Sequence, residues 1–95
     1  MIYISGKITG TSDYLQRFQN AENYLISLGY DVINTAKVNN QLPKNTTYQQ
    51  YMDMSLCMLK MCDTIYMLKC WEDSKGAKVE YDFAMKNKYL IIMEV

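Results

Sequence analysis

The chain has 95 residues, which suits one small domain with a single core and leaves little for a second module. Ten Lys and Arg residues balance ten Asp and Glu residues, so no basic surface is indicated for long nucleic acid or an anionic membrane. The chain has no His, which excludes Ser-His-Asp and Cys-His nucleophile systems and HExxH zinc proteases. We expect one domain over residues 1–95, in which catalysis must rest on carboxylates, Tyr, Lys or backbone dipoles.

The cysteines and the amino-terminal residues indicate the cellular compartment and whether a metal site is expected. Cys57, Cys62 and Cys70 are odd in number and have neither CxxC spacing nor a neighbouring His, so we expect reduced thiols and no metal site. Residues 1–5 read as a strand rather than a signal peptide, and no run approaches membrane-spanning length. The expected location is therefore the cytoplasm, with no membrane partner.

The first half of the chain reads as a strand, a helix and a second strand. Residues 1–5 are a short apolar, strand-forming run. Apolar side chains recur at helical spacing over residues 14–28, and Ser12 or Asp13 can cap this helix. Residues 30–34 then predict the second strand, reached by the short connection typical of an α/β unit.

The second half repeats the alternation after a polar interruption. Residues 35–47 contain one Pro and three Asn, and we expect a surface loop there that could form a lid. A helix is predicted from about residue 47 to residue 62, and a strand over residues 63–68. A further helix begins near residue 74, and residues 89–93 close the chain as a fourth strand. Near-continuous apolar strands alternating with helices predict a four-stranded parallel sheet covered on both faces.

In such a sheet, ligands bind beyond the carboxyl ends of the strands. The loop of residues 6–12 follows the first strand and contains two glycines, three hydroxyl side chains and Lys7, which suit a phosphate or a ribose. A plain strand-to-helix turn has the same composition. Tyr3 lies near this edge, where its hydroxyl could reach a ligand, although a core tyrosine is the alternative.

Residues 73–84 hold the best candidate for chemistry. Ser74 or Asp73 can cap the helix, whose first turn attracts anions, and Gly76 permits close approach to it. Helical steps from Gly76 place Glu80 on the stripe that faces the sheet. The alternative is a surface Glu80 that pairs with a neighbouring lysine.

These residues together resemble the nucleoside 2-deoxyribosyltransferase-like superfamily, and most closely a small family within it that is common in phages and bacteria. The matching segments are residues 2–10, 62–68 and 71–80, and the resemblance covers nearly the whole chain. It implies a flavodoxin-like three-layer sandwich with a four-stranded parallel sheet. It also implies a homodimer or larger homo-oligomer.

The resemblance implies roles for individual residues. The glutamate that matches Glu80 attacks the anomeric carbon and forms a glycosyl-enzyme intermediate, and the tyrosine that matches Tyr3 orients it. A Ser-x-Gly that matches Ser74 to Gly76 binds near the 5′ end of the nucleotide. The candidate binding residues are Ser5, Gly6, Lys7, Gly10, Ser55, Asp63, Trp71, Ser74 and Gly76.

One position departs from the pattern. Active relatives carry an Asp eight residues before the Asp that matches Asp63, where it contacts the sugar or helps protonate the leaving base. That position is Ser55 here. Asp53 lies about 200° around the helix from the required direction and cannot replace it. A serine can hydrogen-bond a sugar hydroxyl but cannot act as an acid at neutral pH.

The leading hypothesis is an enzyme, a hydrolase or transferase, that cleaves or exchanges the N-glycosidic bond of a small nucleoside or nucleotide. It needs no metal and no organic cofactor, because Glu80 and the backbone dipoles belong to the chain. The alternative is a non-catalytic protein that sequesters or senses a nucleotide, with Tyr66 or Trp71 stacking on the base. A structural or partner-binding protein on the same fold is the third hypothesis.

Overall fold

Strands and helices alternate along the whole chain, and the computed structural model of the protein describes all residues from 1 to 95. In chain order the elements are β1 (Ile2–Ser5), α1 (Tyr14–Ser27), β2 (Val32–Asn34), α2 (Thr35–Asn39), α3 (Tyr48–Leu59), β3 (Thr64–Met67), the 3-10 turn η1 (Trp71–Asp73), α4 (Lys75–Lys86) and β4 (Leu90–Met93).

The four strands form one parallel sheet in the order β2-β1-β3-β4. Tyr3 of β1 lies between Ile33 of β2 and Ile65 of β3, and Ile65 in turn pairs with Ile91 of β4. The chain turns to one side of β1 to form β2 and to the other side to form β3. The predicted four-stranded parallel sheet is confirmed, and the strand order reverses between β1 and β3, where ligands bind in folds of this kind.

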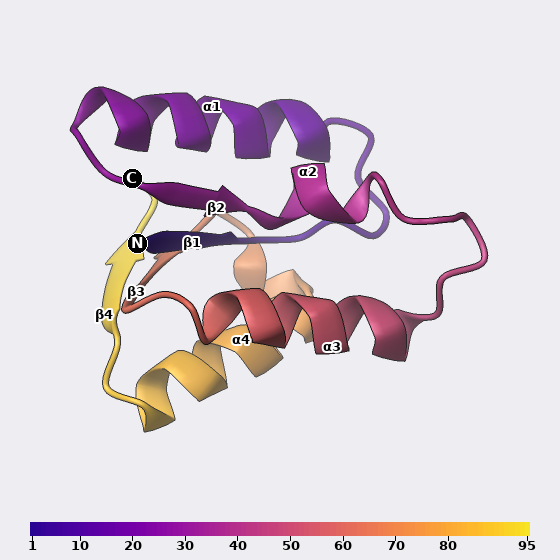
Figure 1. The fold of residues 1–95 in the computed structure, drawn as a ribbon. Helices are drawn as coiled ribbons and strands as arrows, with labels where there is room; N and C mark the ends of the chain where they lie inside the picture. Colours follow the sequence, from indigo (N-terminus) through magenta and orange to yellow (C-terminus); the bar gives the residue numbers. More distant parts are fainter.

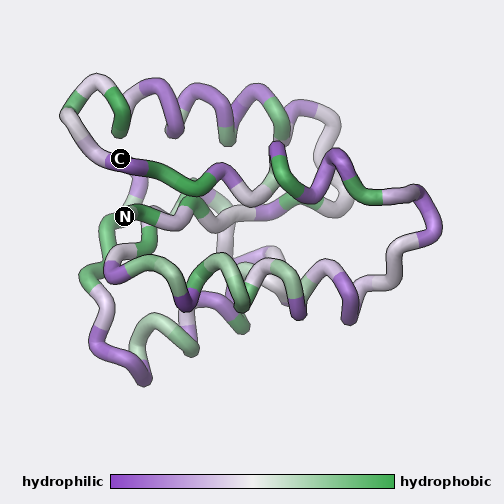
Figure 2. Tube along the Cα trace, viewed as in Figure 1, coloured by the Kyte–Doolittle hydropathy of each residue, from purple (hydrophilic) through white to green (hydrophobic).

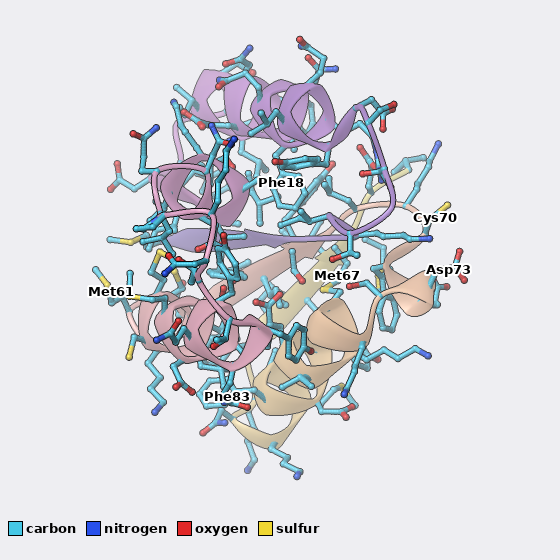
Figure 3. The ribbon with its side chains drawn as sticks, turned by 90° about the vertical axis from the view of Figure 1, so that its right-hand side faces the viewer. Phe18, Met61, Met67, Cys70, Asp73 and Phe83 are labelled. Atoms are coloured by element: carbon cyan, nitrogen blue, oxygen red, sulfur yellow. The ribbon has the colours of Figure 1, made fainter.

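Helices cover both faces of the sheet, which completes three layers (Figure 1). On the α1 face the core contains Ile2, Ile4, Phe18, Ala21, Leu25, Ala36, Tyr66 and Leu68. On the face of α3 and α4 it contains Tyr3, Leu59, Cys62, Ile65, Met67, Ala77 and Ala84. Hydrophobic stretches follow the strands between the two helix layers (Figure 2), and Phe18 points from α1 toward the sheet (Figure 3). The flavodoxin-like three-layer sandwich follows from these cores.

Side chains cap the starts of α3 and α4 but not the start of α1. Thr47 accepts a hydrogen bond from the Gln50 backbone and Gln50 returns one to Thr47, which completes a capping box at α3. Ser74 Oγ accepts from the Ala77 N–H at 3.1 Å and caps α4. Asp13 precedes α1, but neither its side chain nor that of Ser12 makes a capping hydrogen bond, so that part of the prediction is wrong.

The segment predicted as a surface loop from residue 35 to residue 47 begins with a helix instead. Asn34 Oδ1 accepts from the Lys37 N–H at 3.1 Å and starts α2. Thr35 and Ala36 are 3% and 1% exposed, and Ala36 belongs to the core. Five residues are too few to display a helical period, so the buried contacts of α2 left no pattern in the sequence.

None of the helices combines the length and the apolar character needed to cross a membrane.

Candidate functional site

A cavity of about 730 Å³ opens beyond the carboxyl ends of the strands. Its walls come from the loop after β1, from α2 and the chain that follows it, from one side of α3, and from the start of α4. The α3 side presents Tyr48, Tyr51, Met52 and Ser55, which follow the helical spacing of three and four residues. The volume falls within the range of pockets that enclose small ligands.

Glu80 lies in the wall of this cavity and is 5% exposed. The Tyr3 hydroxyl donates to Glu80 Oε2 at 2.5 Å, and the Ser5 hydroxyl donates to Glu80 Oε1 at 2.6 Å. Both donors belong to β1, so the helix side chain reaches across to the strand at the centre of the sheet. The prediction that Glu80 faces inward is confirmed, and the surface alternative is excluded.

The environment of Glu80 acts on its charge in two directions. Burial raises the pKa of Glu80 from 4.5 to about 7, while the hydrogen bonds from Ser5 and Tyr3 favour the carboxylate and lower it. Burial, followed by the charge of Glu80, holds the pKa of Tyr3 well above its usual value. Tyr3 therefore stays protonated and serves as a donor, while Glu80 changes charge near neutral pH.

Small residues let α4 lie close enough to the sheet for Glu80 to contact Tyr3 and Ser5. Ala77 and Ala84 lie on the same side of α4 as Glu80 and are buried against the sheet. A Cβ at Gly76 would lie 3.1 Å from Met52 Sδ, so glycine lets the first turn of α4 approach α3. The Met52 side chain is thus one group that approaches Gly76 closely.

A second group of polar side chains lines the cavity beside the carboxyl. Thr35 Oγ1 and Ser55 Oγ are 3.4 Å apart, and Asn39 Nδ2 donates to Ser55 Oγ at 3.5 Å. Thr35 and Ser55 lie near enough to the Tyr3 hydroxyl to lower its pKa, against the larger opposite effect of burial. Ser55 therefore occupies the cavity side of α3, as predicted.

The mouth of the cavity is positively charged. Lys7, Lys44 and Lys75 line it, and none of them is in an ion pair. Lys75 Nζ lies 5.4 Å from the centre of the Tyr48 ring, which is a cation-π distance. The acidic side chains of the cavity are the exposed Asp73 and the buried Glu80. An excess of positive charge in a chain of net charge zero favours an anionic ligand.

The structure brings together most of the residues that the sequence singled out. Gly6, Lys7, Ser55, Ser74, Gly76 and Glu80 line the cavity. Tyr3 and Ser5 lie behind the carboxyl and contact it directly. A Cβ at Gly6 would lie 2.9 Å from Leu68 side-chain atoms, so this glycine is required where the chain leaves β1 beside β3.

Asp63 and Gly10, two of the proposed binding residues, lie elsewhere. Asp63 precedes β3 at the amino end of the sheet, where it contacts the amino terminus of Met1 at 3.4 Å. Its pKa is lowered by the hydrogen bond from Thr64 first and then by the amino terminus. Gly10 is exposed in the loop before α1, with a φ of +82° that suits glycine in a turn. Neither residue reaches the cavity.

The two aromatic residues proposed for base stacking are engaged elsewhere. Trp71 stacks on Tyr81, with ring centres 4.6 Å apart, and does not line the cavity. Tyr66 is buried in the core on the α1 face. Tyr14, Tyr48 and Tyr51 are the aromatic side chains that line the cavity. Their spacing in the sequence predicted helix faces but did not show which faces meet at the cavity.

The site also contains residues that sequence reasoning missed, chiefly Thr35 and Asn39. Both belong to α2, which was expected to be loop. The signal that could have found them is Asn34, which ends β2 and caps the next turn through its side chain. No three His, Cys, Asp or Glu side chains lie together in a way that could hold a metal ion.

The fold and the site define a small flavodoxin-like α/β protein with a buried glutamic acid in the wall of a cavity at the carboxyl edge of its sheet. The chain belongs to the family described as Domain of unknown function (DUF4406), whose model matches residues 1–93. No curated protein and no solved structure matches the chain significantly.

Proposed function

We propose that the protein binds a small nucleotide in the cavity and cleaves or exchanges its N-glycosidic bond, with Glu80 as the nucleophile. The observation that carries the proposal is the Glu80 carboxyl in the cavity wall, with one hydroxyl donor on each oxygen. A carboxylate fixed in this way suits attack on a carbon that develops oxocarbenium character. The resemblance to nucleoside 2-deoxyribosyltransferases supports the same role for Glu80 and Tyr3.

The reaction would proceed by double displacement. Glu80 forms an ester with the anomeric carbon as the bond to the base breaks, and the base leaves with the bonding electrons and takes a proton from solvent. Water, or a second base, then attacks the same carbon, loses a proton to solvent and releases the carboxylate. Only ionised Glu80 can attack, so the reaction rate should rise with pH around the raised pKa of Glu80, about 7.

The charge at the mouth supports a phosphate-bearing ligand. Ser74 Oγ uses the Ala77 N–H for the cap, and the Lys78 N–H bonds to the Ser74 carbonyl. The N–H groups of Lys75 and Gly76 remain without a backbone or side-chain acceptor, so the first turn of α4 offers two free donors. These donors, the helix dipole and the unpaired lysines favour an anion.

The spacing between the first turn of α4 and Glu80 suits one ligand that contacts both. Gly76 and Glu80 are one helical turn apart, which is about 6 Å along the axis. A phosphate at the first turn would therefore place the sugar ring beside the carboxyl. This arrangement supports a nucleotide over a free nucleoside.

The test is release of free base. The pure protein is incubated with AMP, dAMP and the corresponding pyrimidine nucleotides, and the products are separated by chromatography. Free base is expected from wild type and from Glu72→Ala, which alters an exposed glutamate outside the cavity, and none from Glu80→Ala. Base release by Glu80→Ala at the wild-type rate would contradict the proposed mechanism.

A non-catalytic nucleotide-binding protein is the second candidate function. The observation that favours it is Ser55, a neutral side chain at the cavity position where active relatives are expected to carry an acid. Thermal stabilisation by a nucleotide without release of base would support this function. Neither stabilisation nor base release would favour the third hypothesis, a structural or partner-binding role.

A further inference from the structure

The cavity offers few groups that could protonate a leaving base. Glu80 is the only buried carboxyl in its wall, and it must be ionised to attack the sugar. Asp73 is exposed, precedes the cap of α4 and lies at the outer edge of the molecule (Figure 3). The other polar side chains of the cavity are hydroxyls, amides and lysines, which release protons poorly at neutral pH. A base that leaves from this site therefore receives no proton from a carboxylic acid of the protein.

The polar side chains beside the nucleophile are neutral. Ser55 lines the cavity, and its Oγ lies 3.4 Å from Thr35 Oγ1. Both hydroxyls lie near enough to the Tyr3 hydroxyl to lower its pKa, and Tyr3 in turn donates to Glu80. Ser55 and Thr35 thus occupy the wall next to the nucleophile with groups that form hydrogen bonds but do not act as acids.

Aromatic rings line the same cavity. Tyr14 and Tyr51 are half-buried in its wall, and the Tyr48 hydroxyl lies beside Gly76 in the first turn of α4. The Tyr48 ring already receives a cation, because Lys75 Nζ lies 5.4 Å from its centre. The negative face of an aromatic ring attracts a planar cation more strongly than a neutral ring of the same shape. The walls therefore suit a base that is both planar and positively charged.

We propose that the preferred substrates are nucleotides whose base carries a positive charge in the ring bonded to the sugar, such as a pyridinium or an N-alkylated purine. The inference rests on the proposed function and keeps its nucleophile and its phosphate site. A cationic base leaves as a neutral molecule, so its departure needs no acid. The phosphate outweighs the charge of the ring, so the ligand stays anionic and still suits the lysines at the mouth of the cavity.

The bonds and charges of this reaction balance without an acid. A Glu80 oxygen forms an ester with the anomeric carbon while the carbon–nitrogen bond breaks, and the electron pair of that bond neutralises the ring. Water then attacks the same carbon, loses one proton to solvent and frees the carboxylate. The products are the neutral base, the sugar phosphate and one proton. A neutral base would instead leave as an anion that has to take a proton from solvent.

The first experiment compares pairs of nucleotides that differ in the charge of the ring. Nicotinamide mononucleotide is paired with its reduced dihydropyridine form, and 7-methylguanosine 5′-monophosphate with GMP. Base release by wild type is followed by chromatography and corrected for release in buffer alone. Each charged nucleotide should lose its base at least ~10² times faster than its neutral partner, which is the lower end of what a positioned acid supplies. Equal rates within a pair, or faster release from the neutral partner, overturn the inference.

The second experiment adds an acid to the wall of the cavity. Ser55→Asp should reduce the preference for 7-methylguanosine 5′-monophosphate over GMP by up to ~10²–10⁴-fold, because only the neutral base gains from a proton donor. Ser55→Asn is the matched control, since it has the same shape without the acid, and it should keep the preference. Circular dichroism checks that both variants are folded, and the comparison in wild type does not depend on them. A folded Ser55→Asp that keeps the preference, or a Ser55→Asn that loses it equally, overturns the inference.

The outcomes separate this inference from the proposed function. Base release without a preference for charged rings contradicts the inference and leaves the proposed function standing. Release from none of the four nucleotides contradicts the proposed function and the inference together.

Discussion

Glu80→Gln should remove a pH dependence from the stability of the protein. The folded state raises the pKa of Glu80 from 4.5 to about 7 because the carboxyl is buried, so between these values the folded protein holds a proton that the unfolded chain releases. The contribution of Glu80 to the free energy of unfolding is therefore largest below about pH 4.5 and is lost as the pH rises through about 7. The amide side chain of the Glu80→Gln variant stays neutral at every pH, so the variant should not show this fall.

The magnitude follows from the two pKa values. At about 1.4 kcal/mol per pKa unit, the change from 4.5 to about 7 costs the wild type about 3 kcal/mol of stability at pH 8. This is a large share of the roughly 5–15 kcal/mol that stabilises a typical domain. Glu80→Gln should therefore be more stable than wild type at pH 8, by up to about 3 kcal/mol, and close to wild type at pH 4.5.

The composition makes the measurement clean. The chain has no His, which would otherwise titrate in this window, and the amino terminus is common to both proteins and cancels in their difference. Urea unfolding at pH 4.5, 6, 7 and 8, followed by Trp71 fluorescence and circular dichroism, gives the free energies. Glu72→Gln changes an exposed carboxylate and should keep the wild-type slope.

Two results would refute the reasoning. One is a wild-type free energy of unfolding that stays level or increases between pH 4.5 and pH 8. The other is a Glu80→Gln variant that keeps the wild-type slope, which would assign the pH dependence to other groups. Glu80→Gln should also release no base, so a more stable protein with no activity is the combined expectation.

Three further predictions concern the cavity and the surface. Ser55→Asp should raise base release from AMP by up to ~10²–10⁴-fold, as a positioned acid does. The gain should be lost when Ser55→Asp is combined with Glu80→Ala. Robust wild-type activity on AMP that Ser55→Asp leaves unchanged would contradict this prediction. Ser74→Asp keeps a capping side chain but adds negative charge, so calorimetry should show no phosphate binding, and wild-type affinity would refute the phosphate assignment. The protein should self-associate as a homodimer, since side chains such as Tyr24 and Met61 are 55% and 63% exposed; sedimentation that shows only an 11 kDa species at about 10–50 µM would count against it.

The sequence predicted those parts of the structure that a local pattern determines. The apolar runs around Ile4 and Ile65 predicted buried parallel strands, because helices cover both faces of such strands. The helical steps from Gly76 placed Glu80 toward the sheet, because helix geometry fixes which residues share a face. Neither rule requires knowledge of the segment that packs against the strand or the helix.

Contacts between distant segments were beyond the same rules. Thr35 and Asn39 reach the cavity only because α2 folds back against the sheet and α3, which a five-residue helix does not reveal in its pattern. Trp71 is an aromatic residue of the kind that can stack on a base. Its ring stacks instead on Tyr81, ten positions later in the chain. Asp63 is an exception, because it follows a helix and precedes a strand, and this chain order alone places it at the amino edge of the sheet, away from the cavity.

The number of titratable groups in the cavity constrains the proposed chemistry. Double displacement uses a carboxylate that attacks, and many leaving bases also require a proton donor. Glu80 is the buried acid of this cavity, while Asp73 lies exposed at its mouth. Tyr3 is already committed as a donor to Glu80, and its raised pKa makes it a weak acid. One carboxyl cannot be ionised for attack and protonated for donation in the same step. The proposed reaction therefore suits a base that departs with only solvent to protonate it, and it should be slow for any base that needs an acid from the protein.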